Sequence, residues 1–275
     1  MASAFDLTGS ASLQAADIPE KTLTAFIDRW IYVFMATLFI VVVLVGFIPD
    51  SITKVGMVDA GKRPPFPLVL HMHAVAMGCW LLLLLAQTLL MATGRSAGHR
   101  QLGMAGMVLA PVVVVIGLVL SPTMYHQLWN GLHAAPGGLN EAAQMALMVQ
   151  ARITLLQMQI GVLFPLVVAL ALYARKRDFA THKRLMILVP AAPLIAAIDR
   201  MRWLPNNFPM SPIGSEAYVL LLIAPIFLWD LYRLGRVRRA YLVWFGLFAT
   251  TSIAVNLLWN SVWWQGFVPK LMAVA

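Results

Sequence analysis

The sequence predicts an all-α, polytopic membrane bundle of seven transmembrane helices. Of its 275 residues, 61% are hydrophobic and only 11% are charged, whereas a soluble domain has roughly 45–50% apolar residues. The mean hydropathy is +0.80. Several apolar runs approach or exceed the ~20 residues that cross the hydrocarbon of a bilayer. These runs therefore predict membrane spans and not the core helices of a soluble fold.

Seven apolar runs mark the expected spans, at residues 29–48, 68–92, 102–121, 152–174, 184–200, 217–234 and 241–264. The fifth run is short and contains Pro190 and Pro193. Because proline lacks a backbone donor, we expect these residues to kink the fifth helix. The chain is thus divided into a polar N-terminal tail (1–28), a single transmembrane domain (29–264) and a short C-terminal tail (265–275).

Basic residues are distributed unequally over the two sides of this bundle. With the N-terminus in the cytoplasm, thirteen Lys and Arg residues fall on the cytoplasmic side and seven on the other. The positive-inside rule therefore predicts a cytoplasmic N-terminus and a C-terminus outside. The net charge of +9 is concentrated between the spans, which favours membrane lipids with anionic headgroups as partners over nucleic acid.

Several kinds of chemistry find no support in the sequence. The single cysteine, Cys79, excludes an internal disulfide and every Cys-x-x-Cys motif. A retinal protein needs a lysine inside a late helix, but Lys270 follows the last span. The zinc hydrolases related to ceramidases carry His-x-x-x-His on their last helix, where this chain has Asn256 and Asn260. No Gly-rich phosphate loop or nucleophile elbow is present.

Polar side chains gather near the predicted outer surface, where ionisable groups inside a membrane tend to face the bundle interior or a cavity. They come from five parts of the chain: His71, His73, Gln157, Gln159, Asn256, Asn260, Asp199, Arg200, His126 and His133. Four of the six histidines belong to this side. The sequence therefore predicts a polar, histidine-lined layer in the outer half of the bundle.

His71 and His73 point in different directions, because helical residues two apart differ by about 200°. The stripe through His73 continues as Met77, Trp80, Leu84 and Gln87, while the stripe through His71 contains Ala74 and Gly78. Small residues favour close helix contact. We therefore expect His71 at a helix crossing and His73 facing a wider polar space.

Neutral imidazole is a common ligand of iron, copper and zinc, so this layer is a candidate haem or transition-metal site. The candidate cofactor ligands are His73, His71 and His126, and the candidate metal ligands are His73, His126 and His133. Asp199 is the candidate catalytic residue, and the candidate substrate contacts are Gln157, Asn256, Asn260 and Arg200. The alternative is that the histidines bond between helices or lie at the headgroup boundary.

Two features are predicted on the inner side. His99 and His182 stand at matching positions in the turns "GHRQ" and "THKR", where we expect either an inner bis-histidine pair or a helix start that binds lipid phosphate or is capped there. Asp230 precedes the end of its span and is expected to pair with Arg233, three residues on, or with Arg236.

At "TGRSAGHRQLG" and "HKRLMILVPAAPLIAAIDR" the chain resembles a broad group of bacterial multi-spanning membrane proteins of unknown function, which show His-Arg-x-Leu-Gly and later His-Lys-Arg-Leu-Met turns. The likeness runs from residue 70 to 202. It implies a helical fold in the bacterial cytoplasmic (inner) membrane. The same helices are distantly similar to transmembrane b-type cytochromes, which implies haem held by histidines of neighbouring helices.

Three functions follow from these observations. The first is a haem- or metal-dependent membrane redox protein that acts on a quinone-like or lipid substrate. The second is a cofactor-free binder or carrier of a small amphiphile, using the same polar layer. The third is a structural subunit of a homo-oligomer or larger membrane complex, in which the polar residues only join helices.

Overall fold

The structure, a computed structural model, describes residues 17–135 and 139–274, and within these ranges the chain contains helices and no β-strand. Residues 1–16 of the expected N-terminal tail and residue 275 lie outside the described residues. Seven helical stretches are long and apolar enough to cross a membrane, which confirms the predicted fold class and number of spans. The elements are α2 (Asp17–Asp59), α3 (Leu68–Ala92), α4 (Ser96–His133), α5 (Glu141–Ala174), α6 (Phe179–Leu188), η1 (Ala192–Leu194), α7 (Ile195–Ile198), α8 (Ile213–Leu234), α9 (Arg239–Leu258) and α10 (Val262–Leu271).

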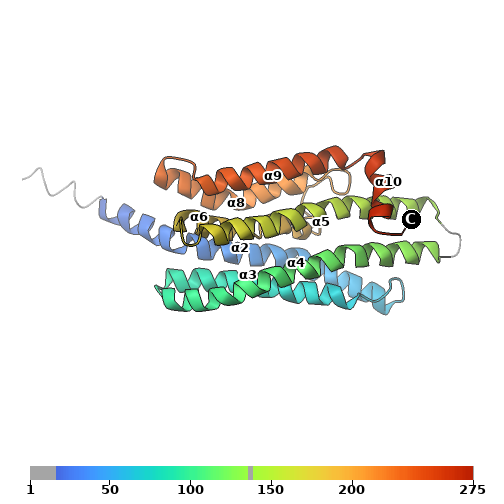
Figure 1. Ribbon diagram of the computed structural model, residues 1–275, viewed down its shortest axis with the longest axis horizontal. Helices are drawn as coiled ribbons and strands as arrows, with labels where there is room; N and C mark the ends of the chain where they lie inside the picture. The colour runs from blue at the N-terminus through green and yellow to red at the C-terminus, as the bar shows by residue number, and fades with distance from the viewer. Residues whose placement is uncertain (1–16, 136–138, 275) are drawn as a thin grey trace, which may run out of the picture.

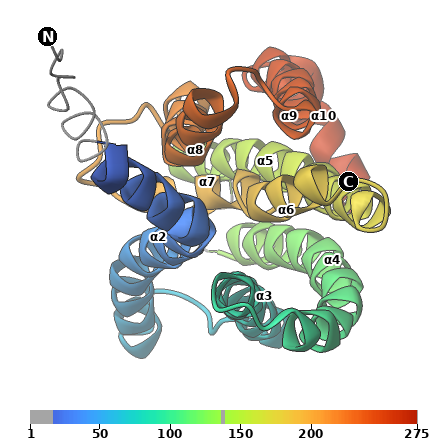
Figure 2. The same cartoon turned by 90° about the vertical axis from the view of Figure 1, so that its left-hand side faces the viewer.

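The helices pack in three layers (Figure 1, Figure 2). The pair α8 and α9 lies on one side and the pair α3 and α4 on the other, with α5 and α6 between them. Helix α2 contacts α3, α7 and α8. The middle layer supplies much of the core, including the fully buried side chains of Leu188, Ala191 and Ile195.

The fifth span is broken at its prolines, as predicted. Helix α6 ends at Leu188, and the chain passes Pro190 and Pro193 before α7 begins at Ile195. Small side chains in this segment, such as Ala197, let α2 approach closely through Gly46. The broken span is consequently the most buried of the seven.

Helix α4 is longer than the predicted third span. It continues through Pro122 to His133, so His126 and His133 lie on this helix and not in the connection where the sequence placed them. The stretch "MYHQLWNGLHAA" contains no helix-breaking pair before Pro136, and a single proline is tolerated when neighbouring helices re-satisfy the freed carbonyl.

The predicted seventh span, 241–264, is in fact two helices. Helix α9 ends at Leu258, and α10 begins after Ser261, whose hydroxyl accepts a hydrogen bond from Trp264 N at 3.0 Å. A serine in this position is a good helix N-cap. Helix α10 turns across the end of the bundle (Figure 1), where Trp264 Nε1 donates to the carbonyl of Ala151 at 2.9 Å.

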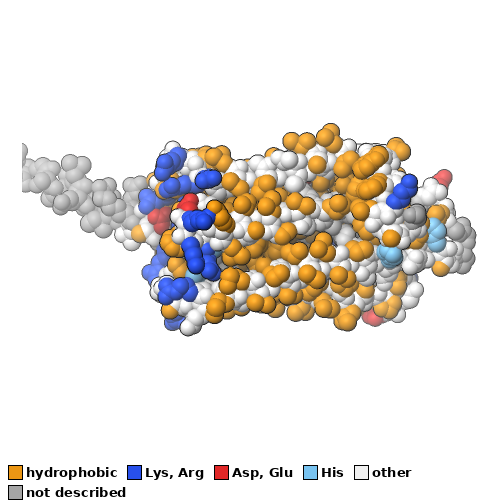
Figure 3. Space-filling view, viewed as in Figure 1, with side chains coloured by type: hydrophobic (Ala, Val, Ile, Leu, Met, Phe, Trp, Pro, Cys, Tyr) orange, Lys and Arg blue, Asp and Glu red, His pale blue; other side chains and the backbone are white. Residues whose placement is uncertain are grey.

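Lysine and arginine side chains gather at one end of the molecule (Figure 3). We call this the basic end; it contains the α3–α4, α5–α6 and α8–α9 turns. The expected pairing of Asp230 with Arg233 or Arg236 is wrong. Asp230 instead accepts from Arg184 at 2.5 and 2.7 Å, and Arg233 bonds to Asp28. Asp230 is buried and faces α6 and α9, so that its partners Arg184 and Tyr241 both come from other helices.

Candidate functional site

The predicted polar layer lies at the end opposite the basic end, and its members form separate groups. In the first group Arg152 is buried and donates to the carbonyls of Trp259 (3.3 Å) and Pro209 (3.2 Å) and to Asn260 Oδ1 (2.7 Å). Arg152 thereby ties α5 to the α9–α10 break. The predicted substrate contact Asn260 is thus engaged by a protein side chain.

The second group joins α5, α8 and α9. Asn256 Nδ2 donates to Glu216 Oε2 at 3.0 Å, and Gln159 Nε2 donates to Ser252 Oγ at 3.0 Å. Asn256 and Asn260, expected on one helix face, therefore bind different partners. Amide and carboxyl groups that bond across helices in this way satisfy polar atoms that a membrane cannot hydrate.

The third group lies between α2 and the segment that follows α7. Arg200 Nε contacts Asp50 Oδ2 at 3.2 Å, and Lys54 Nζ contacts the same oxygen at 2.6 Å. Asp199 accepts a hydrogen bond from the hydroxyl of Ser215. The two predicted neighbours Asp199 and Arg200 thus have different partners, and Arg200 is linked to α2.

Burial raises the pKa of the Asp199 carboxyl to about 6, while the hydrogen bond from Ser215 and the charge of Arg200 act in the opposite direction. Because the pKa of Asp199 is higher in the folded state than the usual value of 3.8, the folded protein binds more protons than the unfolded chain between about pH 4 and pH 6. Stability then falls as pH rises from 4 to 6 and stays lower above it, by about 3 kcal/mol at most.

We therefore expect Asp199→Asn to unfold at a higher temperature than the parent protein at pH 8, with the two converging near pH 4. The asparagine Oδ1 can still accept from Ser215, so the change removes mainly the charge. The measurement is the unfolding temperature in detergent across this pH range. Parallel curves for the two proteins would show that Asp199 does not titrate in this window.

The two histidines of α4 use their rings within the protein. His126 Nε2 lies 2.6 Å from the carbonyl oxygen of Met272, which fastens the C-terminal segment to α4. His133 Nδ1 lies 2.8 Å from the carbonyl of Trp129 and stacks on its indole, with ring centroids 4.2 Å apart. Seven residues separate the two histidines, so they are about 10 Å apart along the helix.

The two histidines of α3 point in different directions, as predicted, but the expected place of His71 at a helix crossing is wrong, because His71 and its stripe neighbour Ala74 are exposed. His71 meets the ring of Phe66 edge-on at 6.2 Å. His73 faces α4, where a Cβ added to Gly117 would lie 3.9 Å from its Cε1. Among residues 17–135 and 139–274 no three His, Cys, Asp or Glu side chains are grouped so as to hold a metal ion. The haem or metal centre stays a prediction.

Gln157, a predicted substrate contact, joins two helices. Its Oε1 accepts from Ser121 Oγ at 2.7 Å, which connects α5 to α4. In the described structure Gln157 therefore serves the packing of this helix pair.

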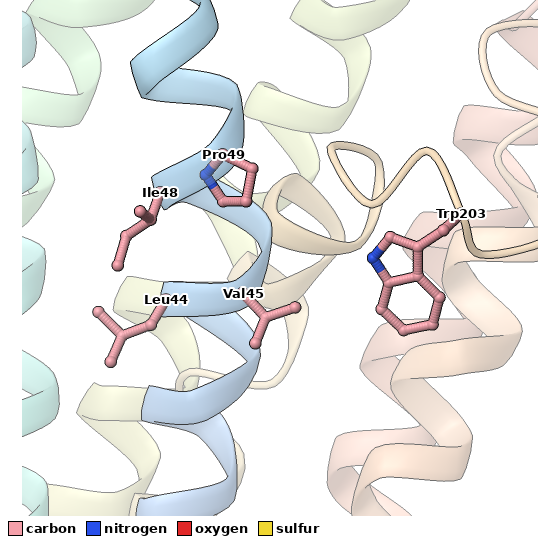
Figure 4. A pocket seen from close by; sticks show the side chains of 5 residues that line it. All are labelled: Leu44, Val45, Ile48, Pro49 and Trp203. Atoms are coloured by element: carbon pink, nitrogen blue, oxygen red, sulfur yellow. The ribbon is translucent and has the colours of Figure 1, made fainter.

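A groove runs along α2 beside the third polar group (Figure 4). It has a volume of 340 Å³ and is lined by Leu44, Val45, Ile48, Pro49 and Trp203. We call it the α2 groove. Leu44 and Ile48 are 48% and 50% exposed, and Trp203 is 70% exposed on the far side of the groove. The groove therefore opens outward on the surface of the bundle.

A smaller cavity of 160 Å³ adjoins the α2 groove, with which it shares Val45, Pro49 and Trp203. Its other lining residues are Asp50, Thr53, Arg200, Met201 and Arg202. We call it the basic pocket, because Arg200, Arg202 and the adjacent Lys54 outnumber the carboxylates of Asp50 and the adjacent Asp199. The combined site is apolar along α2 and cationic at its end.

Sequence reasoning found Arg200 in this site but missed Asp50, Thr53 and the α2 side of the groove. Asp50 and Thr53 lie two and five residues beyond the predicted end of the first span at residue 48, whereas Leu44, Val45 and Ile48 fall within that span and gave no sign of a site. The spacing of Asp50 and Lys54 by four residues was the available signal. Glu216 and Arg152 were missed as interior polar groups because each stands near a predicted span boundary.

No known protein-family model, curated protein or solved structure matches this chain.

Proposed function

We propose that this protein is a multi-pass protein of the bacterial cytoplasmic membrane that binds an anionic amphiphile in the α2 groove and basic pocket. The observation that carries the proposal is the continuity of an apolar groove with a cationic pocket through Val45, Pro49 and Trp203. An amphiphile has the same two parts, an apolar chain and a polar headgroup.

The charge distribution along the bundle supports an orientation. Since basic loops stay in the cytoplasm, the basic end (Figure 3) is the cytoplasmic end. The N-terminus is then cytoplasmic, and the C-terminus and the basic pocket face the outside. The amphiphile accordingly enters the α2 groove from the outer leaflet.

Electrostatics select the headgroup. Asp50 is engaged by Arg200 and Lys54, and the charge of Asp199 also acts on Arg200, so two carboxylates oppose three cations when Arg202 is included. A guanidinium binds phosphate or carboxylate through paired hydrogen bonds. Trp203 stands at the mouth of the pocket, and tryptophan favours the headgroup level of a membrane. The expected ligand therefore carries a phosphate or carboxylate headgroup.

Thermal stability tests this proposal. Didecanoyl phosphatidylglycerol should raise the unfolding temperature of the delipidated protein in neutral detergent, whereas phosphatidylcholine of the same chain length should not. A ligand at 100 times its Kd stabilises the folded state by about 2.7 kcal/mol. Inorganic phosphate alone should have no effect, because it lacks the chain that fills the groove.

Arg202→Gln should remove most of this stabilisation, because it takes one cation from the basic pocket without touching the Arg200–Asp50 pair. Lys270→Gln is the matched control, since Lys270 lies on α10 and does not line the pocket. Equal stabilisation by the two lipids, or an Arg202→Gln response equal to that of the parent protein, would contradict the proposal.

A further inference from the structure

One face of α3 carries polar atoms that have no hydrogen-bond partner among the described residues. They are His73 Nδ1, Trp80 Nε1 and Gln87 Oε1, all buried. The three residues are spaced by seven, so they lie in one stripe along the helix. The stripe is interior, because Trp80 is only 3% exposed and its indole meets Phe164 of α5 at 5.1 Å.

Helix α4 lies beside α3 (Figure 2), and two of its glycines stand next to this stripe. A Cβ added to Gly117 would lie 3.9 Å from His73 Cε1, and one added to Gly103 would lie 3.5 Å from Gln87 Nε2. The glycines therefore leave room beside both polar side chains. The side chains face the α4 interface and not the lipid.

Further polar groups extend the stripe toward the basic end. His99 Nδ1 is also buried without a partner among the described residues, and its imidazole approaches the carbonyl of Gln87. His182 is near enough to His99 for their charges to interact, and its Nδ1 lies 2.8 Å from the carbonyl of Ala171. Four of the nine unpartnered buried side-chain atoms in the described structure thus belong to this one interface.

The chemistry of these atoms points to water as their ligand. Trp80 Nε1 is only a donor and Gln87 Oε1 only an acceptor, while an imidazole nitrogen takes either role. A metal ion does not satisfy an N–H donor. The room beside the stripe is small, because a single Cβ added to either α4 glycine would already reach van der Waals contact and Phe164 packs on Trp80, so a solute much larger than water does not fit. Water is small, and both donates and accepts, as buried polar groups require.

We propose that bound water molecules line this face of α3 and join its polar atoms into one hydrogen-bonded path from His73 to the His99 and His182 pair. Fourteen residues of helix separate His73 from Gln87, which is about 21 Å of the ~30 Å hydrocarbon thickness. Histidine donates and accepts protons readily, and one stands at each end. The solute that such a path suits is the proton.

Exchange of the Trp80 indole N–H into heavy water tests the middle of the path. Trp244 and Trp264 are the controls, because they are as buried as Trp80 and donate to the carbonyls of Leu188 and Ala151. In ¹⁵N-labelled protein, with Trp80→Phe used for assignment, the Trp80 N–H should exchange at least about tenfold faster than either control, since local hydration and not opening of the bundle limits it. Exchange as slow as that of Trp244 would overturn the proposal.

Thiol labelling tests the whole length of the path. In a Cys79→Ser background, the thiol of His73→Cys, Trp80→Cys or Gln87→Cys should react with aqueous Ag⁺, because the thiolate forms only where water reaches it. Val75, Leu82 and Leu89 stand at the same depths on the exposed face of α3, and cysteine there should remain unreactive in a bilayer. Met77→Cys replaces Trp80→Cys if the latter does not fold. Labelling at the ends only, or equally on both faces, would overturn the continuous path.

Discussion

Asp230→Ala is expected to lower the free energy of unfolding by about 3–5 kcal/mol, the usual effect of removing one partner of a buried ion pair. The Asp230 carboxylate accepts from Arg184 at 2.5 and 2.7 Å and from the hydroxyl of Tyr241 at 2.6 Å. Arg184 is only 4% exposed. Without the carboxylate its charge stays buried and unpaired between α6, α8 and α9.

An exposed ion pair provides the matched control. Asp28 and Arg233 are bonded at 2.8 Å, but their side chains are 42% and 40% exposed. Asp28→Ala should therefore cost less than about 1 kcal/mol. The measurement is the unfolding free energy in mixed micelles of increasing denaturing detergent. Equal losses for the two variants would contradict the assignment of Asp230 as the buried partner.

Removal of both charges separates the two sources of the loss. The double variant Arg184→Met, Asp230→Leu should recover most of the stability, because replacing a buried pair by apolar side chains is often neutral or stabilising. A double variant as unstable as Asp230→Ala would indicate that packing, and not the unpaired charge, causes the loss.

Gly46→Ala is the second large expected effect. A Cβ at this position would lie 2.8 Å from the carbonyl carbon and 2.9 Å from the Cα of Ala197, and closer still to its oxygen. These are backbone atoms of the broken fifth span, so no side chain can turn away. We expect the overpacking to separate α2 from α7 and to cost about 1–3 kcal/mol.

Gly56 of the same helix is the control, since a Cβ there would meet nothing within 4 Å. Gly56→Ala should leave stability unchanged or raise it by up to about 1 kcal/mol, because alanine favours the helix. Because Gly46 is near the α2 groove, its alanine variant should also weaken amphiphile binding. Equal stability of the two alanine variants would mean that α2 and α7 are not in close contact.

Features of the fold that depend on residues close together in the sequence could be predicted, namely the spans and the break in the fifth one. Apolar run lengths identified the seven spans, and Pro190 and Pro193 located the break in the fifth. The predicted seventh span was wrong in one respect. The polar residues Asn260 and Ser261 separate α9 from α10, and hydropathy averaged over a whole span does not reveal so short a break. Helix α4 ran past its predicted end because helix extension beyond the membrane leaves no hydropathy signal.

The site was harder to predict because its parts are distant in the chain. Arg200 and Asp50 are 150 residues apart, and no periodicity connects them. The same holds for Arg184 and Asp230, which are 46 residues apart. Arg200 was predicted near the outer surface, but nothing in the sequence indicated that Asp50 is its partner. The predicted histidine layer included His126 and His133, whose rings bond to backbone carbonyls.

The haem or metal cofactor, the redox activity and the assembly into an oligomer or complex stay predictions. An absorption spectrum with elemental analysis tests the first two.

The central claim is that the α2 groove holds the chain of an anionic amphiphile beside Trp203. Quenching of tryptophan fluorescence by phosphatidylglycerol brominated on its acyl chains tests it most directly. The quenching should saturate with added lipid, and Trp203→Phe should lose the saturable part. Arg202→Gln should shift half-saturation at least about tenfold, which corresponds to 1.4 kcal/mol. Quenching that does not saturate, that persists in Trp203→Phe, or that brominated phosphatidylcholine reproduces equally would contradict the claim.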